Sequence, residues 1–226
     1  MTDSRRPALR EPRPLCPRCE RPQSGCLCRW ITPTPNRVEL LILQHPLEVQ
    51  QAKGSARLLR LSLAHCRCEV GEAFDPRLLA TWLGAPLEAS CAAPGMSTAP
   101  ARNLLLYPAD AGSAVPSIPL PLPATAAWRL VLLDGTWRKT RKLLHANPLL
   151  RALPRWPLPA PPPSRYTIRR AQREDQRSTL EAACLALGVL ENEPARYAPL
   201  LTAFDGWVAE QANWASGSRR RTGSPG

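Results

Sequence analysis

The chain has 226 residues and a formal net charge of +12 at pH 7, and 44% of its residues are hydrophobic. This length holds one sizeable domain with a small appendage and excludes a large multi-domain assembly. No apolar run approaches the roughly 20 residues of a membrane-spanning helix, and the N-terminus has no apolar core that a secretory signal would need. The sequence therefore predicts a cytoplasmic protein without membrane association, and nothing in it points to a protein partner.

The positive charge is concentrated in one part of the chain. Residues 128–177 hold twelve basic and three acidic residues, a net charge of +9, whereas residues 31–127 hold seven of each. Such a block within folded elements favours a surface that faces a polyanion, and nucleic acid is the leading partner. A high genomic GC content, which raises arginine counts everywhere, is the alternative, but the balanced stretch before the block argues against it.

A basic arm at residues 1–14 is followed by four clustered cysteines. Cys16, Cys19, Cys26 and Cys28 form the pattern C-x2-C-x6-C-x-C. In a chain without a secretion signal, clustered thiols indicate metal ligands, and four thiolates favour a structural, tetrahedral zinc ion. The close spacing of Cys26 and Cys28 leaves a three-thiolate site or an unmetallated redox pair as alternatives. The sequence thus predicts a small zinc knuckle over residues 15–31.

Apolar runs in the next part of the chain, residues 32–214, predict a folded domain. The predicted buried strands are Val38–His45, Arg102–Tyr107, Trp128–Asp134 and Arg165–Arg169. The predicted helices are 48–63, 76–83, 137–146, 178–190 and 195–214. Alternating strands and helices indicate an α/β fold, in which a mostly parallel sheet is covered by helices on both faces.

The remaining segments have weaker signals. For Cys66 and Cys68, alternate positions of a strand without a metal are favoured. The proline-rich stretches 116–123 and 154–163 are predicted to connect elements without forming helix or strand. The tail 215–226, with three arginines among glycine and serine, is predicted to be disordered and to touch RNA nonspecifically.

A short motif follows the strand that ends at Asp134. Gly135, Thr136 and Trp137 lead from that strand into a helix, and ligands of open α/β sheets bind beyond such strand ends. Gly135 permits a tight turn and a close backbone approach. The spacing fits two interpretations equally well. Asp134 could bind a ligand, or Asp134 or Thr136 could cap the helix.

The helix 137–146 is predicted to have two different faces. At about 100° per residue, one arc holds Trp137, Thr140, Leu143 and Leu144, which are expected to pack. The opposite arc holds Arg138, Lys139, Arg141, Lys142 and His145, and such a cationic face can bind phosphates.

Two further patterns are interpreted as local structure. Ser178 and Glu181 match a capping box at the start of a helix. His45 and Pro46 follow the first strand and are typical of a turn between a strand and a helix, with a structural role for the histidine.

Five motifs in a fixed order identify a family. After the cysteine cluster come LILQHPLE (41–48), LLLYP (104–108), LLDGTWRKTRKLL (132–144) and STLEA (178–182). Together they resemble the DTW-domain family of tRNA-uridine aminocarboxypropyltransferases, over residues 16–207. The pair D-x-T-W and S-T-x-E-A is far more specific than either motif alone. One departure is the segment QAKGSARL at 51–58, where the family commonly has a threonine-rich turn before Gly-Arg-Leu.

The resemblance implies a fold related to the knotted SPOUT methyltransferases, with S-adenosylmethionine as the donor and N3 of a tRNA uridine as the acceptor. It implies catalytic roles for Asp134, Thr136 and Trp137. It implies donor binding by Tyr107, Pro108, Leu133, Asp134, Gly135, Ile168, Ser178, Thr179 and Glu181. It implies RNA binding by Arg138, Lys139, Arg141, Lys142, Arg169 and Arg170.

Asp134 has two possible tasks in this chemistry. It could remove the N3 proton of the uridine, although an unperturbed aspartate with a pKa of about 3.9 is a poor base for so weak an acid. It could instead hold the ammonium group of the donor, for which Glu181 is the second candidate. Two other functions remain open on sequence grounds: a SPOUT-type RNA methyltransferase, and a non-catalytic zinc-ribbon protein that binds RNA.

Overall fold

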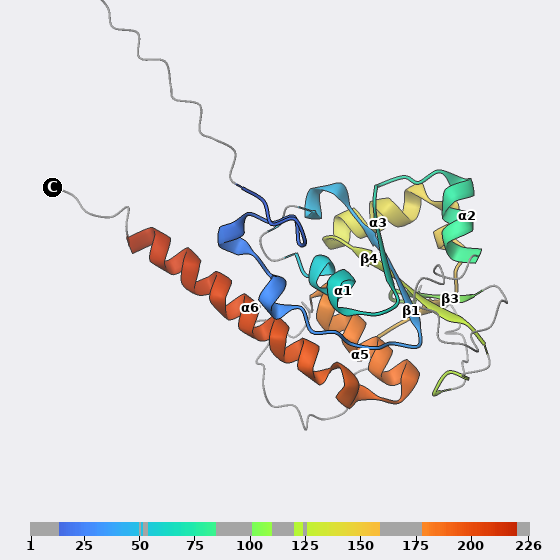
Figure 1. Ribbon diagram of the computed structural model, residues 1–226. Helices are drawn as coiled ribbons and strands as arrows, with labels where there is room; N and C mark the ends of the chain where they lie inside the picture. Colours follow the sequence, from blue (N-terminus) through green and yellow to red (C-terminus); the bar gives the residue numbers. More distant parts are fainter. Residues whose placement is uncertain are drawn as a thin grey trace, which may run out of the picture.

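The computed structural model describes residues 14–49, 51, 54–84, 101–109, 120–123, 126–158 and 178–220. Its centre is a five-stranded parallel sheet with the order β2-β1-β4-β3-β5 (Figure 1). The strands are β1 (Glu39–Gln44), β2 (Cys66–Val70), β3 (Arg102–Leu106), β4 (Trp128–Asp134) and β5 (Arg155–Trp156). The α/β class and the parallel sheet are therefore confirmed, as is a strand that contains both Cys66 and Cys68.

The two central strands are buried along their whole length. Every residue of β1 and of β4 is buried, including the charged pair Glu39 and Arg129. Arg129 Nε donates to Glu39 Oε2 at 2.9 Å, so the two buried charges compensate each other. At the opposite end of the same strands, the register sets Gln44 beside Asp134.

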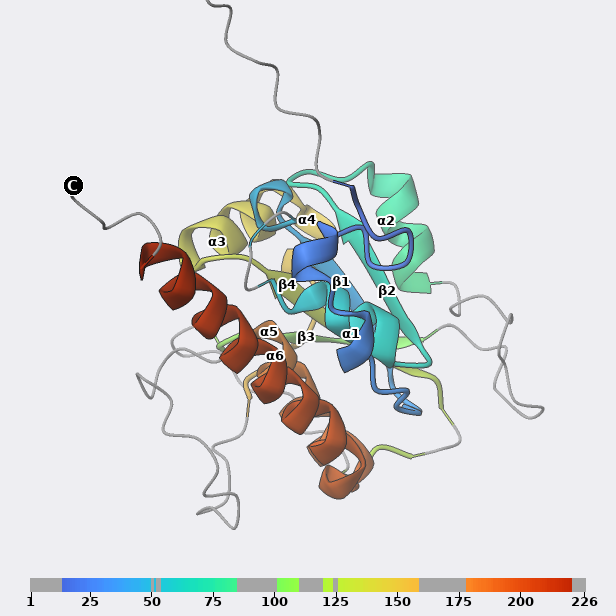
Figure 2. The same cartoon turned by 60° about the vertical axis from the view of Figure 1, so that its left-hand side comes forward.

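Helices cover both faces of the sheet, as predicted (Figures 1 and 2). On one face lie α1 (Ala56–Ser62), α5 (Thr179–Glu191) and α6 (Pro194–Arg220). On the other lie α2 (Pro76–Gly84), α3 (Trp137–Ala146) and α4 (Pro148–Arg151). Successive strand residues point to opposite faces, so Leu40 and Ile42 contact the first layer and Leu41 and Leu43 the second. Because helices pack against both faces of the sheet, the strand side chains on both faces are apolar. This explains the continuous apolar runs in the strand sequences.

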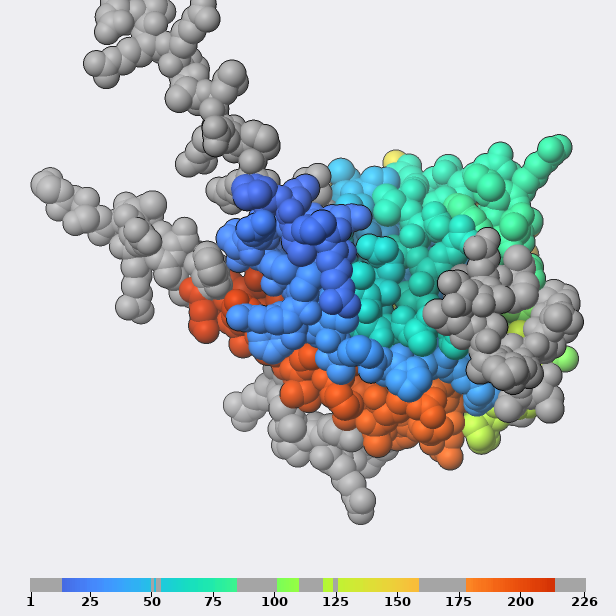
Figure 3. Space-filling model, in the orientation of Figure 1, coloured from blue at the N-terminus to red at the C-terminus, as the bar shows by residue number. Residues whose placement is uncertain are grey.

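The N-terminal segment packs against the C-terminal helix. It contains the short helices η1 (Gln23–Gly25) and η2 (Cys28–Trp30), and Figure 3 shows this blue segment seated between α1 and α6. Trp30 Nε1 donates to Glu210 Oε2 at 3.0 Å. A Cβ on Gly206 would lie 2.3 Å from the Trp30 ring, so only glycine allows this approach.

Three predicted boundaries are wrong. The helix predicted at 48–63 is shorter, because η3 (Pro46–Glu48) is followed by a turn and α1 begins only after Gly54, a residue that disfavours helix. Residues 215–220 of the predicted disordered tail continue α6 as helix. The proline-rich stretch 154–163 contains β5, a two-residue edge strand that fits between Pro154 and Pro157.

Two expectations about the fold remain predictions. The strand predicted at 165–169 lies outside the described residues, and the SPOUT-like knot is not settled by the described elements. Among the helices that the structure describes, none is both long and apolar enough to cross a membrane.

Candidate functional site

Asp134 is a buried carboxyl group held by two neutral donors. It ends β4, and only 7% of its surface is exposed. Gln44 Nε2 donates to Oδ2 at 2.7 Å, and the Thr179 hydroxyl donates to Oδ1. Burial raises the pKa of Asp134, while the hydrogen bonds from Thr179 and Gln44 act in the opposite direction. The ends of β1 and β4 and the start of α5 thus fix one carboxyl group in place.

The turn after Asp134 brings the backbone close to α3 without a side-chain cap. Thr136 occupies the N-cap position of α3, but its side chain makes no capping hydrogen bond. The two carboxylate oxygens of Asp134 accept from Gln44 and Thr179 instead. The interpretation of Asp134 or Thr136 as a side-chain cap of α3 is therefore wrong. A Cβ on Gly135 would lie 3.1 Å from the Cβ of Lys139, which explains the glycine.

The start of α5 positions Thr179. Glu181 N donates to Ser178 Oγ at 3.2 Å, and Ser178 N donates to Glu181 Oε2 at 2.9 Å. The predicted capping box is therefore confirmed. Because this box fixes the first turn of α5, the hydroxyl of Thr179 is held toward Asp134.

His45 and Glu72 form a second polar group beside this carboxyl. Leu47 N donates to His45 Nδ1 at 3.2 Å, so the ring proton is on Nε2, which donates to Glu72 Oε2 at 3.0 Å. Lys142 Nζ lies 2.8 Å from Glu72 Oε1, and the contacts with Lys142 and His45 lower the pKa of Glu72. The structural role predicted for His45 agrees with these bonds.

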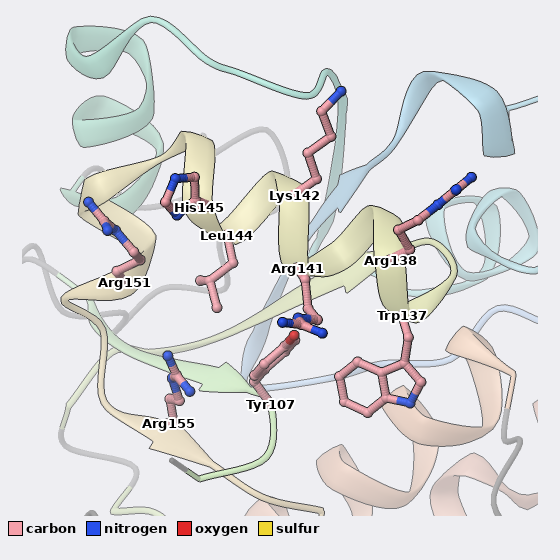
Figure 4. A pocket seen from close by; sticks show the side chains of 9 residues that line it. All are labelled: Tyr107, Trp137, Arg138, Arg141, Lys142, Leu144, His145, Arg151 and Arg155. Carbon is pink, nitrogen blue, oxygen red and sulfur yellow. The ribbon is translucent and has the colours of Figure 1, made fainter. Parts of the chain in front are cut away.

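The cationic face predicted for α3 is divided in two. Lys139 is paired with Glu48 at 2.7 Å, and Lys142 with Glu72. The arginines of α3 instead border an open hollow of about 770 Å³ (Figure 4). Its lining residues are Tyr107, Trp137, Arg138, Arg141, Lys142, Leu144, His145, Arg151 and Arg155.

Trp137 does not pack into the core as predicted. Its surface is 61% exposed, whereas Thr140, Leu143 and Leu144 are buried as expected. As the first residue of α3, Trp137 directs its side chain back toward the N-terminus of the helix, beyond the last residue of β4. Its ring meets that of Tyr107 edge to face, with 5.4 Å between centroids.

The other predicted site residues differ in their burial, and some of them lie outside the described residues. Pro108 is exposed beyond the end of β3, close to the turn that carries Tyr107. The side chain of Leu133 packs in the core under α3, so only its backbone can meet a ligand. Ile168, Arg169 and Arg170 lie outside the described residues.

Sequence reasoning missed several polar residues at this edge of the sheet. They are Gln44, Glu48, Glu72, Arg151 and Arg155. The sequence did contain a signal for Gln44. It is the polar residue at the end of an apolar strand, so it lies at the same edge of the parallel sheet as Asp134. The others depend on contacts between distant elements.

The four N-terminal cysteines converge on one point. Their Sγ atoms all lie within 4.8 Å of one another, with 3.5 Å between Cys16 and Cys28 and 3.7 Å between Cys19 and Cys26. A tetrahedron with metal–sulfur bonds of about 2.3 Å has edges of about 3.8 Å. Backbone hydrogen bonds from Cys19 and Arg18 lower the pKa of Cys16 to about 6, whereas burial and the hydrogen bond with Cys16 raise the pKa of Cys28 to about 12. This cluster could hold a metal ion.

Comparisons with known proteins add a second line of evidence. The sequence model of the DTW domain matches residues 13–212. The tRNA-uridine aminocarboxypropyltransferase 2 of Mus musculus is 31% identical over 185 residues, which cover 80% of this chain and 58% of that protein. The protein of the same name from Drosophila melanogaster is 33% identical over 185 residues, covering 79% of this chain and 67% of its own.

The chain is shorter than these relatives. In Macaca fascicularis, tRNA-uridine aminocarboxypropyltransferase 2 is 31% identical over 187 residues, and the match again spans little more than half of that protein, 57%. No solved structure matches the chain significantly.

Proposed function

Because this chain belongs to the DTW domain family, we propose that it is a transferase that modifies tRNA. In this proposal it moves the 3-amino-3-carboxypropyl group of S-adenosylmethionine to N3 of a uridine. The names of its mouse and fly relatives denote an aminocarboxypropyl transfer to a tRNA uridine, which supports the group and the acceptor class. The observation that supports it best is the buried carboxyl of Asp134, held by Gln44 and Thr179 at the carboxyl edge of a parallel sheet. It directly precedes α3, the helix whose arginines border the basic hollow.

The proposed reaction exchanges one bond for another. N3 of the uridine gives up its proton and bonds to the γ-carbon of the methionine-derived chain. The bond between that carbon and the sulfonium sulfur breaks, and its electron pair leaves with neutral 5'-methylthioadenosine. The sulfonium activates three carbons, so the protein selects the product mainly by orienting the uridine toward one of them.

Asp134 would supply the carboxylate that this chemistry requires. Its two hydrogen-bond donors are neutral, so the ionised form keeps a negative charge that a cationic group can compensate. Burial raises its pKa, which also makes it a better proton acceptor for N3. Glu181 is engaged in the capping box, so Asp134 is the stronger candidate for the ammonium group of the donor.

The surroundings of Asp134 fit a positively charged donor. The nearby lysines are already paired, Lys139 with Glu48 and Lys142 with Glu72, so neither competes for Asp134. S-adenosylmethionine, when bound, supplies the alkyl group. The residues proposed to hold it are Tyr107, Pro108, Asp134, Gly135, Ser178, Thr179, Glu181, the backbone of Leu133, and Ile168, whereas Thr136 is proposed to act beside Asp134 in catalysis.

We propose that the tRNA backbone binds at the side of α3 that borders the hollow. Arg138 and Arg141 border the hollow, and guanidinium groups bind phosphates in forked geometry. Arg169 and Arg170 are retained as proposed RNA contacts from the sequence.

Two further parts of the proposal concern the scaffold. We infer that the cysteine cluster holds one structural zinc ion, because its sulfur spacing fits a closed tetrahedral site. We also infer a SPOUT-like knot, which the parallel sheet with helices on both faces supports.

The decisive experiment is a transfer assay. Purified protein is incubated with an unmodified tRNA transcript and S-adenosylmethionine, and the nucleosides are analysed by mass spectrometry. We expect aminocarboxypropyl-uridine and an equal amount of 5'-methylthioadenosine. Methylated uridine with S-adenosylhomocysteine would indicate a methyltransferase instead. A protein that binds RNA but not S-adenosylmethionine would be a non-catalytic RNA-binding protein.

A further inference from the structure

The basic residues around α3 differ in whether their charge is already compensated. Lys139 and Lys142 each hold a glutamate. In contrast, no carboxylate in the described part of the chain forms an ion pair with Arg138, Arg141 or Arg151. Of these three, Arg141 and Arg151 place uncompensated charge around the hollow bordered by β3, α4 and β5.

The side chains around the hollow differ in direction. In Figure 4, Arg141, Tyr107 and Arg155 extend into the space below α3, whereas Arg138 and Lys142 extend away from it. The Arg155 guanidinium lies over the Tyr107 ring, 5.4 Å from its centroid. Acidic side chains are absent from the lining formed by the described residues. A region of this charge attracts an anion.

The hollow also offers an aromatic surface. Trp137 keeps 61% of its surface exposed at one end of the hollow, and its edge-to-face contact with Tyr107 holds both rings in place. Exposed aromatic rings among arginines are typical of proteins that stack unpaired bases and bind the adjoining phosphates. The volume, about 770 Å³, lies within the range of sites for small ligands and is suited to one nucleotide.

The chemistry of the acceptor points in the same direction. N3 of uridine lies on the edge that pairs with another base, so a uridine that reacts at N3 must be unpaired. We propose that the hollow is a subsite for an unpaired nucleotide beside the acceptor uridine, with its phosphate on Arg141 and Arg151 and its base against the aromatic rings. This inference rests on the proposed function for the identity of the acceptor, but not for the binding of single-stranded RNA.

Binding of two RNA probes tests the subsite. The probes are octauridylate and a blunt RNA duplex of eight base pairs, and the full-length protein is titrated with each at several salt concentrations. We expect the wild-type protein to bind octauridylate at least about tenfold more tightly than the duplex. In Arg141→Ala/Arg151→Ala, affinity for octauridylate should fall at least about tenfold. The slope of log affinity against log salt should become shallower by about 1.4, because two phosphate contacts are lost.

Matched variants separate local contacts from overall charge. Arg60→Ala/Arg77→Ala removes the same charge from exposed positions of α1 and α2 and should change octauridylate affinity by less than about twofold. Arg141 and Arg151 are both exposed, so their removal leaves the Arg155 contact with Tyr107 in place, and equal melting temperatures of the two variants check that both are folded.

The outcomes distinguish the subsite from the transferase reaction. Equal affinity for the two probes, or equal affinity of the hollow variant and the Arg60→Ala/Arg77→Ala control, would overturn the subsite even if tRNA is modified. Preferential, arginine-dependent binding of octauridylate supports the subsite even if the transfer assay yields no modified uridine.

Discussion

The side-chain amide of Gln44 donates to Oδ2 of Asp134 at 2.7 Å, across the ends of the two central strands. Both residues are almost completely buried, so this bond is not exchanged for one with bulk water. A neutral donor in such a place stabilises the ionised carboxyl without cancelling its charge. Gln44 thereby orients Asp134 together with Thr179, and both bonds lower its pKa against the larger effect of burial.

Gln44→Leu should shift the pH profile of transfer. The hydrogen bond from Gln44 lowers the pKa of Asp134, so its loss should raise that pKa above its already elevated position. Asp134 then ionises only at higher pH, so the acidic limb of the rate profile should shift to higher pH. Rates measured across pH at saturating tRNA check this. An unchanged limb would show that Asp134 ionisation does not govern the rate. Gln23→Leu, at an exposed position of η1, is the control.

Asp134→Asn should leave the fold intact and remove activity. Because burial raises the pKa of Asp134, the ionised group lowers native-state stability above its unfolded pKa of about 3.9, and asparagine removes that cost. We expect a melting temperature at neutral pH no lower than that of the wild type, and a transfer rate reduced by roughly two orders of magnitude or more.

Donor affinity in Asp134→Asn then assigns the role of the carboxyl. Unchanged affinity for S-adenosylmethionine would point to proton removal, and weakened affinity to contact with the ammonium group. Transfer at close to the wild-type rate would return Asp134 to a purely structural role.

Arg138→Glu/Arg141→Glu should weaken tRNA binding strongly and flatten its salt dependence. Replacing two phosphate contacts on duplex-like RNA should reduce the slope by about 1.8 or more. Lys142 is a poor choice for such a test, because its reversal would set two carboxylates together at Glu72. Filter binding at several salt concentrations measures the slope. Affinity like that of the wild type in a folded variant would show that the RNA lies elsewhere.

Metal content should depend on each of the four cysteines. Untagged protein is expected to contain one zinc ion per chain by elemental analysis, and Cys19→Ser should lose it, because binding and local folding are coupled. The segment 14–31 should then become sensitive to protease while the sheet stays folded. Absence of stoichiometric zinc from the wild type would contradict the zinc assignment.

Gly206→Ala should loosen the N-terminal segment from α6. The new methyl group would overlap the Trp30 ring, so either the ring or the segment has to move. We expect a lower melting temperature and faster zinc loss to a chelator than in Ala209→Gly, a substitution at an exposed position of the same helix. Equal rates of loss would show that the contact with α6 does not support the metal site.

Local patterns predicted those elements that depend on neighbours in sequence. The apolar runs located β1, β3 and β4, and the periodicity of 137–146 gave the bounds of α3. The polar strand β2 lacks such a run, and β5 depends on pairing with β3. In the site, Asp134 and Thr179 were identified from their motifs, but the bond from Gln44 depends on the register between strands 90 residues apart. Trp137 is exposed because of where the sheet ends, and the residues next to Trp137 in the sequence do not indicate that position.

The contact between Thr179 and Asp134 has a consequence for protein synthesis. Thr179 lies 45 residues after the carboxyl that it holds, so a growing chain on the ribosome presents Asp134 and Gln44 well before their third partner is made. Until α5 emerges, one oxygen of the carboxyl lacks its donor and the layer over that face of the sheet is missing. A partly synthesised chain therefore presents its cysteine cluster early, but it acquires a complete Asp134 site only after α5 has emerged.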